Sequence, residues 1–329
     1  MKKHLQKLYE HHRLSSEEAY DALHKISTGQ ANQSQIASFT TIFLMRGLSV
    51  NELKGFSDVL LQLCKPVKLN QQTIDVCGTG GDGKNTFNIS TLSAFVIAAS
   101  GVPVAKHGNY GVSSVSGSSN VLEYLGYKFT DDANHLQRQL DKTNICFMHA
   151  PLFHPALKHA APIRKDLGVK TFFNMLGPLL NPALPEFRMI GVYNTEIGRS
   201  YHYLLQQQNK PYAVVHSLDG YDEISTTGDF KLYSKKGEEQ ISMSSLNMDI
   251  CLPQDLYGGA SVKEAAELFI QIIKGKGTTA QHNAIIANSA IAIECATNYT
   301  LEQALNIAKE TLLSGRAFQT YNNLINTQL

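Results

Sequence analysis

A glycine-rich segment from Thr73 to Thr91, TIDVCGTGGDGKNTFNIST, constrains the fold more than any other part of the chain. It begins with a β-rich run, Thr73 to Cys77, after which four glycines fall within six residues. The apolar run Leu92 to Ala99 is long enough for a helix that begins near Ser90. Glycines let a backbone approach a ligand closely, and free N–H groups at a helix start favour an anion such as phosphate. The order strand, glycine loop and helix start therefore predicts a phosphate-binding loop.

Two common nucleotide-binding motifs share letters with this loop but not its context. In a dinucleotide site, G-x-G-x-x-G opens the helix directly and an acidic residue ends the next strand. Here the predicted helix begins only near Ser90, and the next predicted strand, Val102 to Ala105, is followed by Lys106 and not by an acidic residue. The Walker motif G-x-x-x-x-G-K requires Ser or Thr next, where this chain has Asn85. A nicotinamide cofactor and a nucleoside triphosphatase are therefore both disfavoured, as is a tight turn without a ligand.

Composition narrows the class of protein. The 329 residues suffice for one large domain and a smaller one. A net charge of +1 gives no electrostatic argument for binding nucleic acid or an acidic membrane. The five cysteines include no C-x-x-C pair, which argues against a zinc ribbon or a disulfide framework. With no apolar signal core after Met1 and no apolar run beyond helix length, we expect a cytoplasmic protein without a membrane span.

The chain changes character near Pro66. Before it, apolar residues recur at helical spacing and predict four helices, within residues 5–12, 15–29, 34–46 and 50–64. After it, β-rich runs alternate with helical runs, which is typical of a mostly parallel α/β sheet. The predicted strands are 73–77, 102–105, 145–148, 189–193 and 212–216 with a hairpin over 231–241, and the late helices are 262–274, 282–297 and, as the last long one, 301–314. Two short helices are expected within 156–168, and an irregular proline-rich loop over 174–182.

A second glycine-serine loop, Lys106 to Ser114, follows the strand after the first loop. Ser118 to Asn120 then open a short helix that Gly126 closes, and Asn120 with Glu123 fits a capping box. Lys106 can bind phosphate as a point charge or extend into water, as most lysines do. Two neighbouring loops of this kind could enclose a ligand with two phosphate groups.

Two further features suggest ligand chemistry. Asp222 and Glu223 follow the predicted strand 212–216, and hard oxygen ligands near a phosphate site suggest magnesium held by one or two carboxylates and substrate oxygens. On their own they would be an ordinary acidic turn. Arg164 can bind a carboxylate through a bidentate fork or lie at the surface, and the sequence does not separate the two.

These stretches together resemble the anthranilate phosphoribosyltransferases almost from end to end. The matching motifs are Gly78 to Asp82, Asn88 to Thr91, Lys106 to Asn109, Ser113–Ser114 with Ser116 to Ser118, the segment from Phe153 to Gly168, Asn174 to Pro182, and Asp219 to Glu223. One departure stands out, because the family often has arginine after the histidine-glycine-asparagine motif, where this chain has Tyr110.

The resemblance implies a small helical domain packed on a large, mostly parallel α/β domain of the nucleoside phosphorylase/phosphoribosyltransferase type. It implies a small domain of residues 1–65, joined by helices from about 155–175, a large domain of residues 70–329, and a homodimer formed through the helical domain. The implied reaction, a step of tryptophan biosynthesis, transfers the phosphoribosyl group of 5-phosphoribosyl 1-pyrophosphate to anthranilate, with Mg²⁺ as cofactor. Because the amine is already a nucleophile, no residue is assigned as a catalytic base.

The resemblance also implies the site residues. Phosphoribosyl pyrophosphate is expected at Gly78, Gly81, Asp82, Thr86, Asn88, Ile89, Ser90, Thr91, Lys106, His107, Gly108, Asn109, Ser113, Ser114 and Ser118. Anthranilate is expected at Gly78, Asn109 and Arg164, and Mg²⁺ at Ser90, Asp222 and Glu223.

Two alternatives remain open at this point. A pyrimidine nucleoside phosphorylase shares this fold and a related glycine loop, but those chains are longer, with a further C-terminal domain that is missing here. A non-catalytic relative that binds nucleic acid should show a basic surface, which the net charge of +1 disfavours.

Overall fold

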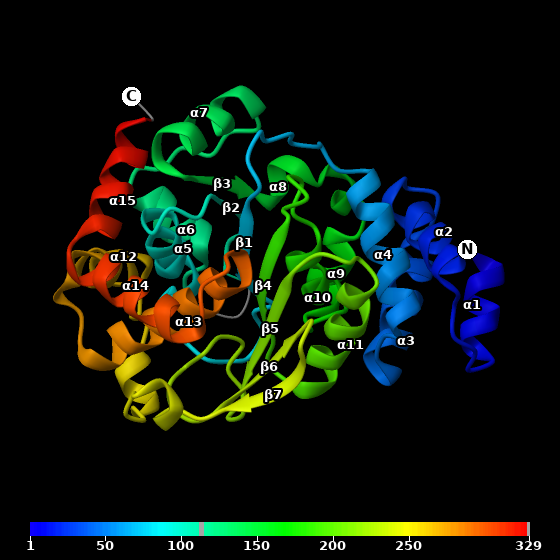
Figure 1. The fold of residues 1–329 in the computed structure, drawn as a ribbon. Helices are drawn as coiled ribbons and strands as arrows, with labels where there is room; N and C mark the ends of the chain where they lie inside the picture. The colour runs from blue at the N-terminus through cyan, green and yellow to red at the C-terminus, as the bar shows by residue number, and fades with distance from the viewer. Residues whose placement is uncertain (112–114, 328–329) are drawn as a thin grey trace. The chain divides into compact units, whose positions relative to one another are not determined.

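The computed structural model describes residues 1–111 and 115–327. Its contacts divide the chain into two compact units, of which the first combines Met1–Pro66 with Pro151–Pro182 and the second combines Val67–Ala150 with Ala183–Leu329 (Figure 1). Among the described residues, no helix is both long and apolar enough to cross a membrane.

The first unit is entirely helical. Three of its helices begin with capping boxes, in which the side chains of Ser15, Asn32 and Ser49 accept from the N–H three residues later, and the side chain of that later residue accepts from the N-cap N–H. Its helices are α1 (Lys2–Tyr9), α2 (Ser16–Ser27), α3 (Gln33–Arg46), α4 (Val50–Gln62), α8 (Ala150–Phe153), η1 (Pro155–His159), α9 (Ala161–Leu167), α10 (Phe173–Leu176) and η2 (Gly177–Leu179).

An aromatic cluster joins the two chain segments of this unit. The ring of Phe172 lies 4.8 Å from that of Phe56 and 5.3 Å from that of Phe43, measured between centroids. The expectation of an irregular loop over 174–182 is wrong for residues 174–179, which are helical in α10 and η2. Pro178 stands in the first turn of η2, where a missing N–H costs nothing.

The second unit is built on one sheet of seven strands in the order β3-β2-β1-β4-β5-β6-β7. The pairs among β1 to β5 are parallel, and β6 and β7 add an antiparallel hairpin. The predicted fold class is therefore confirmed. The strands are β1 (Ile74–Gly78), β2 (Val104–Gly108), β3 (Ile145–His149), β4 (Phe187–Gly191), β5 (Tyr212–Ser217), β6 (Phe230–Ser234) and β7 (Gly237–Ile241).

Helices cover both faces of this sheet. In Figure 1, α13 and α11 lie on opposite sides of β4 and β5. The apolar core packs Val76 and Val104 of the sheet against α5, α13 and the helices behind them. The helices are α5 (Ile89–Ala99), α6 (Ser118–Tyr124), α7 (Ala133–Thr143), α11 (Thr195–Gln206), η3 (Ser244–Leu246), η4 (Pro253–Leu256), α12 (Val262–Gln271), η5 (Ile272–Lys276), α13 (Thr279–Ala296), α14 (Leu301–Leu313) and α15 (Arg316–Asn326).

The expectation that 301–314 holds the last long helix is wrong, because α15 follows with 11 residues. Its buried side chains are Ala317, Tyr321 and Leu324, which recur at helical spacing. This helical pattern is difficult to recognise in the sequence, because one of its three apolar residues is a small alanine and polar residues surround it.

Candidate active site

The sheet order creates one place where a ligand site is expected. The chain runs from β1 outward to β2 and β3, then returns to the other side of β1 to form β4. In open parallel sheets, ligands bind beyond the carboxyl ends of the strands at such a reversal. The glycine loop follows β1, and the Asp222–Glu223 pair follows β5, two strands away.

The glycine loop adopts a backbone that other residues rarely can. Gly80, Gly81 and Gly83 have φ angles of 66°, 83° and 74°, in the left-handed region that strongly favours glycine. This conformation lets the Gly80 N–H donate to Asp222 Oδ2 at 2.6 Å, although the two residues are 142 positions apart in the chain. The loop therefore directs backbone donors toward the carboxylate pair.

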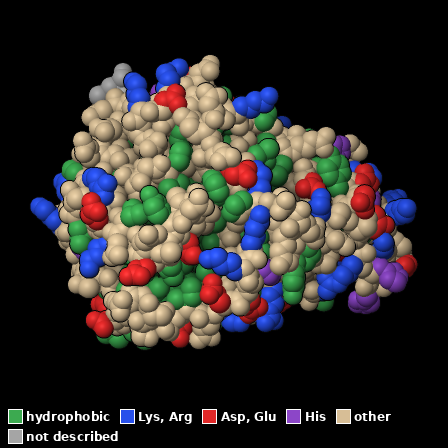
Figure 2. Space-filling model, in the orientation of Figure 1, with side chains coloured by type: hydrophobic (Ala, Val, Ile, Leu, Met, Phe, Trp, Pro, Cys, Tyr) green, Lys and Arg blue, Asp and Glu red, His purple; other side chains and the backbone are tan. Residues whose placement is uncertain are grey.

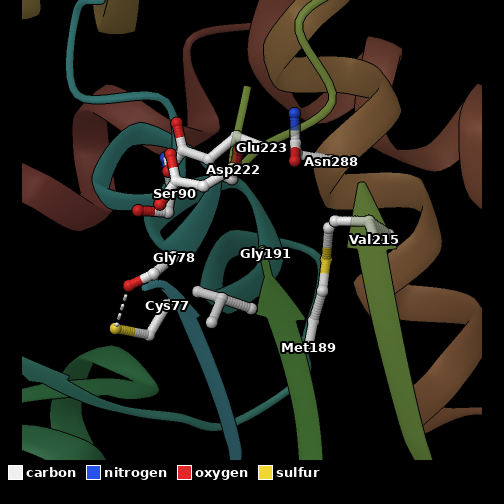
Figure 3. A pocket seen from close by; sticks show the side chains of 11 residues that line it. Cys77, Gly78, Ser90, Met189, Gly191, Val215, Asp222, Glu223 and Asn288 are labelled. Carbon is white, nitrogen blue, oxygen red and sulfur yellow. Dashed lines mark hydrogen bonds between the residues drawn. The ribbon is translucent and has the colours of Figure 1, made fainter. Parts of the chain in front are cut away.

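The start of α5 meets the second carboxylate of the pair. The Ser90 N–H donates to Glu223 Oε1 at 3.0 Å. Asn88, the N-cap residue, makes no side-chain cap and instead donates to the Ser116 carbonyl at 3.3 Å. The loop after β1, the start of α5 and the Asp222–Glu223 pair thus form one cluster, together with Gly78 and Asn288 (Figure 3).

Both carboxyl groups lie in an environment that disfavours negative charge. Burial and the neighbouring Glu223 carboxylate raise the pKa of Asp222 well above its ordinary value. Burial raises the pKa of Glu223 to about 7, although Ser90 and Lys106 act in the opposite direction. A divalent cation would stabilise both charged forms, so the donor set fits Mg²⁺. Among the described residues no three His, Cys, Asp or Glu side chains gather into a metal site.

Gly191, at the end of β4, is a site residue that the sequence analysis missed. A Cβ atom there would lie 1.6 Å from the backbone oxygen of Asp222, and one on Gly78 would lie 2.2 Å from Asp222 Oδ2. Only glycine at both strand ends lets the carboxylate loop approach the sheet this closely. The available signal was a glycine inside a predicted parallel strand.

We expect Gly191→Ala to weaken binding of the ligand expected from the sequence, phosphoribosyl pyrophosphate with Mg²⁺, by about tenfold to a hundredfold, because disturbing the residues that orient metal ligands typically costs that much in metal affinity. The added methyl group must push the Asp222 backbone away, since that contact is with main chain and not with a flexible side chain. Titration calorimetry measures the change. Gly228→Ala is the matched control, because a Cβ there meets no atom within 4 Å; equal affinities in the two variants would contradict the prediction.

The second predicted loop lies beside the first. Lys106 is buried, and its amine donates to the Val76 carbonyl and, at 3.4 Å, to Ser90 Oγ. The alternative of a solvated lysine is therefore wrong. The His107 N–H donates to Asp75 Oδ1 at 3.1 Å. The amine thus links β1 to the start of α5 and places a positive charge near Glu223.

The loop after β2 is tied to the start of α6. The Asn109 carbonyl accepts from the Ser119 N–H at 3.2 Å and from Ser118 Oγ at 3.4 Å. A Cβ on Gly108 would lie 2.3 Å from Ser118 Oγ, so a larger residue there would make the Ser118 side chain shift. Tyr110 packs edge-on against the His149 ring at 4.6 Å, and its hydroxyl donates to Glu123 at 3.2 Å.

The predicted capping box at Asn120 is wrong. The N-cap residue of α6 is Gly117, and Asn120 Oδ1 accepts from the N–H groups of Gly117 and Gly111, both at 2.9 Å. Asn120 is therefore the third residue of the helix and not its N-cap: its oxygen caps the Gly117 N–H and also ties Gly111 to the start of α6. The predicted site residues Ser113 and Ser114 lie outside the described residues.

The remaining predicted residues fall at the edge of the cluster or in the other unit. Thr86 pairs with Tyr257 in an isolated bridge, and Asp82 accepts from the Lys84 N–H within the glycine loop. Arg164 belongs to the helical unit, in the last turn of α9. Its guanidinium lies 5.1 Å from the centroid of the Phe173 ring, and burial lowers its pKa.

Comparisons with known proteins define the class. A family model described as the a/b domain of a glycosyl transferase family matches residues 70–318, and the helical bundle domain of that family matches residues 2–64. The chain therefore belongs to this glycosyl transferase family, and relatives that it matches over nearly their whole length are named anthranilate phosphoribosyltransferase.

The similarity to individual relatives is extensive. The anthranilate phosphoribosyltransferase of Flavobacterium psychrophilum is 51% identical over 98% of each chain. That of Cytophaga hutchinsonii is 46% identical over 99% of this chain and 100% of its own. Among solved structures, the Thermus thermophilus enzyme has a TM-score of 0.92 at 30% identity, covering 98% of each chain. The Saccharomyces cerevisiae enzyme in complex with PRPP and Mg has a TM-score of 0.90 at 26% identity, covering 99% of this chain and 96% of its own.

Proposed function

We propose that this protein transfers the phosphoribosyl group of 5-phosphoribosyl 1-pyrophosphate to anthranilate, giving N-(5-phosphoribosyl)anthranilate and pyrophosphate in tryptophan biosynthesis. Family membership supports this function. The observation that carries it is the convergence of the glycine loop, the start of α5 and the Asp222–Glu223 pair at the reversal of the sheet. Such a site suits a ligand that bears phosphate groups and a divalent cation.

The residues of this cluster suit binding and orientation. The glycine loop and the Asn88 to Thr91 segment supply backbone N–H and hydroxyl groups, which bind phosphate oxygens. They bring no strong nucleophile, so the pyrophosphate is expected to leave when the amine nitrogen attacks the ribose carbon. The bond from that carbon to pyrophosphate breaks, its electron pair goes to pyrophosphate, and the amine loses a proton. Donors aimed at the departing oxygens stabilise this charge.

We assign Mg²⁺ to Ser90, Asp222 and Glu223. Bound there, Mg²⁺ would neutralise charge on the pyrophosphate. The protein's part is to hold the two carboxylates in place through the Gly80 and Ser90 N–H groups. The yeast relative was solved with PRPP and Mg, which supports the use of Mg²⁺ by this protein.

We assign the carboxylate of anthranilate to Arg164, with Gly78 and Asn109 as further contacts. Among the described residues, no carboxylate lies within ion-pair distance of the Arg164 guanidinium. It is half-buried on the Phe173 ring, and a partly buried cation without a counter-charge suits an anionic ligand.

Arg164→Ala is expected to raise the KM for anthranilate about tenfold to a hundredfold, since losing a charged hydrogen bond costs about 1.5–3 kcal/mol. The KM for phosphoribosyl pyrophosphate should change much less. Arg164→Lys should recover only part of the loss, because lysine lacks the planar fork. Steady-state kinetics with each substrate varied in turn measures this. The exposed neighbour Lys165 gives the control Lys165→Ala; if both alanine variants match the wild type, Arg164 does not bind anthranilate.

Pyrophosphate release that requires both anthranilate and Mg²⁺ tests the function directly. Phosphate-dependent cleavage of a pyrimidine nucleoside, without this release, would instead indicate the phosphorylase. On the face shown in Figure 2, basic and acidic side chains are interspersed, which gives no support to a nucleic-acid-binding relative.

We further propose a cytoplasmic homodimer formed through the helical unit. Light scattering of the purified protein would test the dimer. Substituting the exposed Met45 of α3 with a charged residue should then shift the mass toward the monomer, if this face is the interface.

A further inference from the structure

An asparagine on α13 holds the backbone directly after the carboxylate pair. Asn288 is 3% exposed and lines the same pocket as Ser90, Asp222 and Glu223 (Figure 3). It lies 64 residues from Ile224 in the chain, so only the fold brings it to the site. None of the roles assigned above uses it.

The Asn288 side chain forms hydrogen bonds with both backbone groups of Ile224, its N–H and its carbonyl. Its Nδ2 donates to the Ile224 carbonyl at 2.8 Å, and its Oδ1 accepts from the Ile224 N–H at 3.1 Å. The second Nδ2 hydrogen goes to the Ala284 carbonyl, one turn earlier in α13, at 2.8 Å. Exchanging the amide oxygen and nitrogen would set an oxygen against two carbonyls and a nitrogen against an N–H. The network therefore fixes the orientation of the amide.

Hydrogen bonds from β5 also fix the residues before and after Ile224. Ser217 Oγ donates to the Glu223 carbonyl at 2.8 Å and accepts from the Ser225 N–H at 3.1 Å. We call residues 222–225 the carboxylate strap. Its first two residues carry the carboxylates, and its last two are fixed by hydrogen bonds to α13 and β5.

We propose that Asn288 is a positioning residue for magnesium binding, acting through the backbone of the carboxylate strap. This inference rests on the proposed function, which assigns Mg²⁺ to Asp222 and Glu223. With the Ile224 backbone bound at both its N–H and its carbonyl, rotation of the neighbouring peptide groups would break at least one hydrogen bond. The carboxylate of Glu223 is then held opposite the Ser90 N–H before any ligand arrives. Groups that orient metal ligands in this way affect metal affinity without touching the metal.

Asn288→Ala tests the proposal through binding as well as activity. The Mg²⁺ concentration for half-maximal binding of phosphoribosyl pyrophosphate, measured by calorimetry, should rise about tenfold to a hundredfold. Saturating Mg²⁺ should restore most of kcat, because both carboxylates remain. Hydrogen exchange of peptides covering the strap should become faster, since the Ile224 N–H loses its acceptor. Ser289→Ala is the matched control, because Ser289 is the next residue of α13, is fully buried, and has no hydrogen bond to the strap.

A purely structural role predicts a different pattern. It would lower stability and yield while leaving the half-saturating Mg²⁺ concentration at the wild-type value, and that result would overturn the proposal. Should Asn288→Ala not fold, Asn288→Ser decides, because its hydroxyl can still bond the Ala284 carbonyl within the helix and only Ile224 loses its partners. A wild-type protein that releases no pyrophosphate with anthranilate would refute the proposed function. The exchange and Mg²⁺-binding comparisons would still decide the role of Asn288.

Discussion

Replacing Asp222 with asparagine and Glu223 with glutamine together is expected to lower kcat/KM at least about a hundredfold, because metal-ion charge stabilisation supplies several kcal/mol of the transition-state energy. Steady-state kinetics across a Mg²⁺ titration measures the effect, and a chelator should abolish the wild-type activity in the same assay. The chain should remain folded. In the wild type the Gly80 and Ser90 N–H groups donate to the two carboxylates. The side-chain amide oxygens of the variant can still accept these hydrogen bonds.

This double variant should also be more stable than the wild type in the absence of Mg²⁺. Burial raises the pKa of both carboxyl groups, so folding disfavours their charged forms at neutral pH. Neutral amides remove that cost, and the melting temperature should rise while activity falls. Asp219→Asn, an exposed acid in the same turn, should change neither quantity much. An unchanged Mg²⁺ response in the double variant would remove both residues from the metal site.

The loops of this site were predictable because their signals are local. Glycines at 78, 80, 81 and 83 follow a β-rich run directly, and the carboxyl ends of parallel strands meet at one edge of a sheet. The Asp222–Glu223 pair follows another such strand. Strand ends and loop chemistry together therefore predict a phosphate and metal site without any knowledge of contacts.

Other parts of the site depend on contacts between residues far apart in the chain. Gly191 matters only because the Asp222 backbone lies against it, and Asn288 only because Ile224 does. Asn120 shows a different limit. Its spacing to Glu123 satisfies a local capping rule, yet its oxygen accepts from Gly111 and Gly117. The rule identified the right kind of contact but placed the start of the helix three residues too late.

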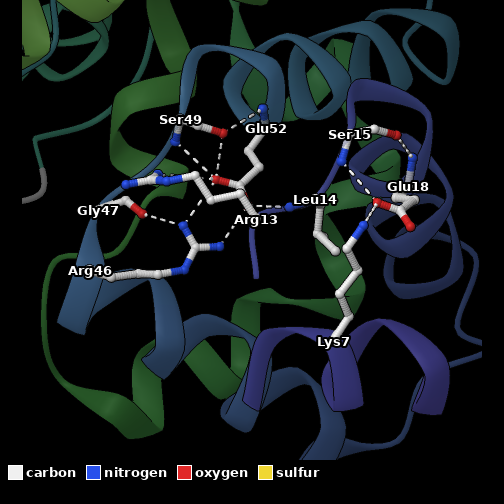
Figure 4. A network of polar contacts seen from close by, with 9 residues as sticks. All are labelled: Lys7, Arg13, Leu14, Ser15, Glu18, Arg46, Gly47, Ser49 and Glu52. Carbon is white, nitrogen blue, oxygen red and sulfur yellow. Dashed lines mark hydrogen bonds and ion pairs between the residues drawn. The ribbon is translucent and has the colours of Figure 1, made fainter. Parts of the chain in front are cut away.

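The helical unit contains a buried carboxylate that is bound by residues from several of its segments. Glu52 of α4 is fully buried. Arg46 donates to it through both terminal nitrogens, at 2.6 and 3.1 Å (Figure 4). The Leu14 N–H and the N–H and hydroxyl of Ser49 complete the set, at 2.9, 2.9 and 2.7 Å. The carboxylate thereby joins the start of α4, the end of α3 and the turn before α2.

Glu52→Gln is expected to lower the free energy of unfolding by about 3–5 kcal/mol, the usual cost of removing one partner from a buried ion pair. Glutamine keeps the shape of the side chain, but its NH₂ group would face donors from Arg46 and Ser49. Urea denaturation followed by circular dichroism measures the loss. Asp58→Asn, on the exposed side of the same helix, breaks only the surface pair with Lys54 and should cost less than about 1 kcal/mol.

The pH dependence of stability provides a second test of the Glu52 network. Burial alone would raise the pKa of Glu52, but hydrogen bonds from Arg46, the Leu14 N–H and Ser49 outweigh it and hold the pKa below its ordinary value of 4.5. A carboxyl group whose pKa is depressed by folding contributes stability above its unfolded value, and that contribution disappears as the pH falls through the folded value. The wild type should therefore lose stability more steeply than Glu52→Gln as the pH is lowered from 4.5. If the stability of both proteins falls equally steeply with pH, the charged Glu52 carboxylate does not stabilise the helical unit as described.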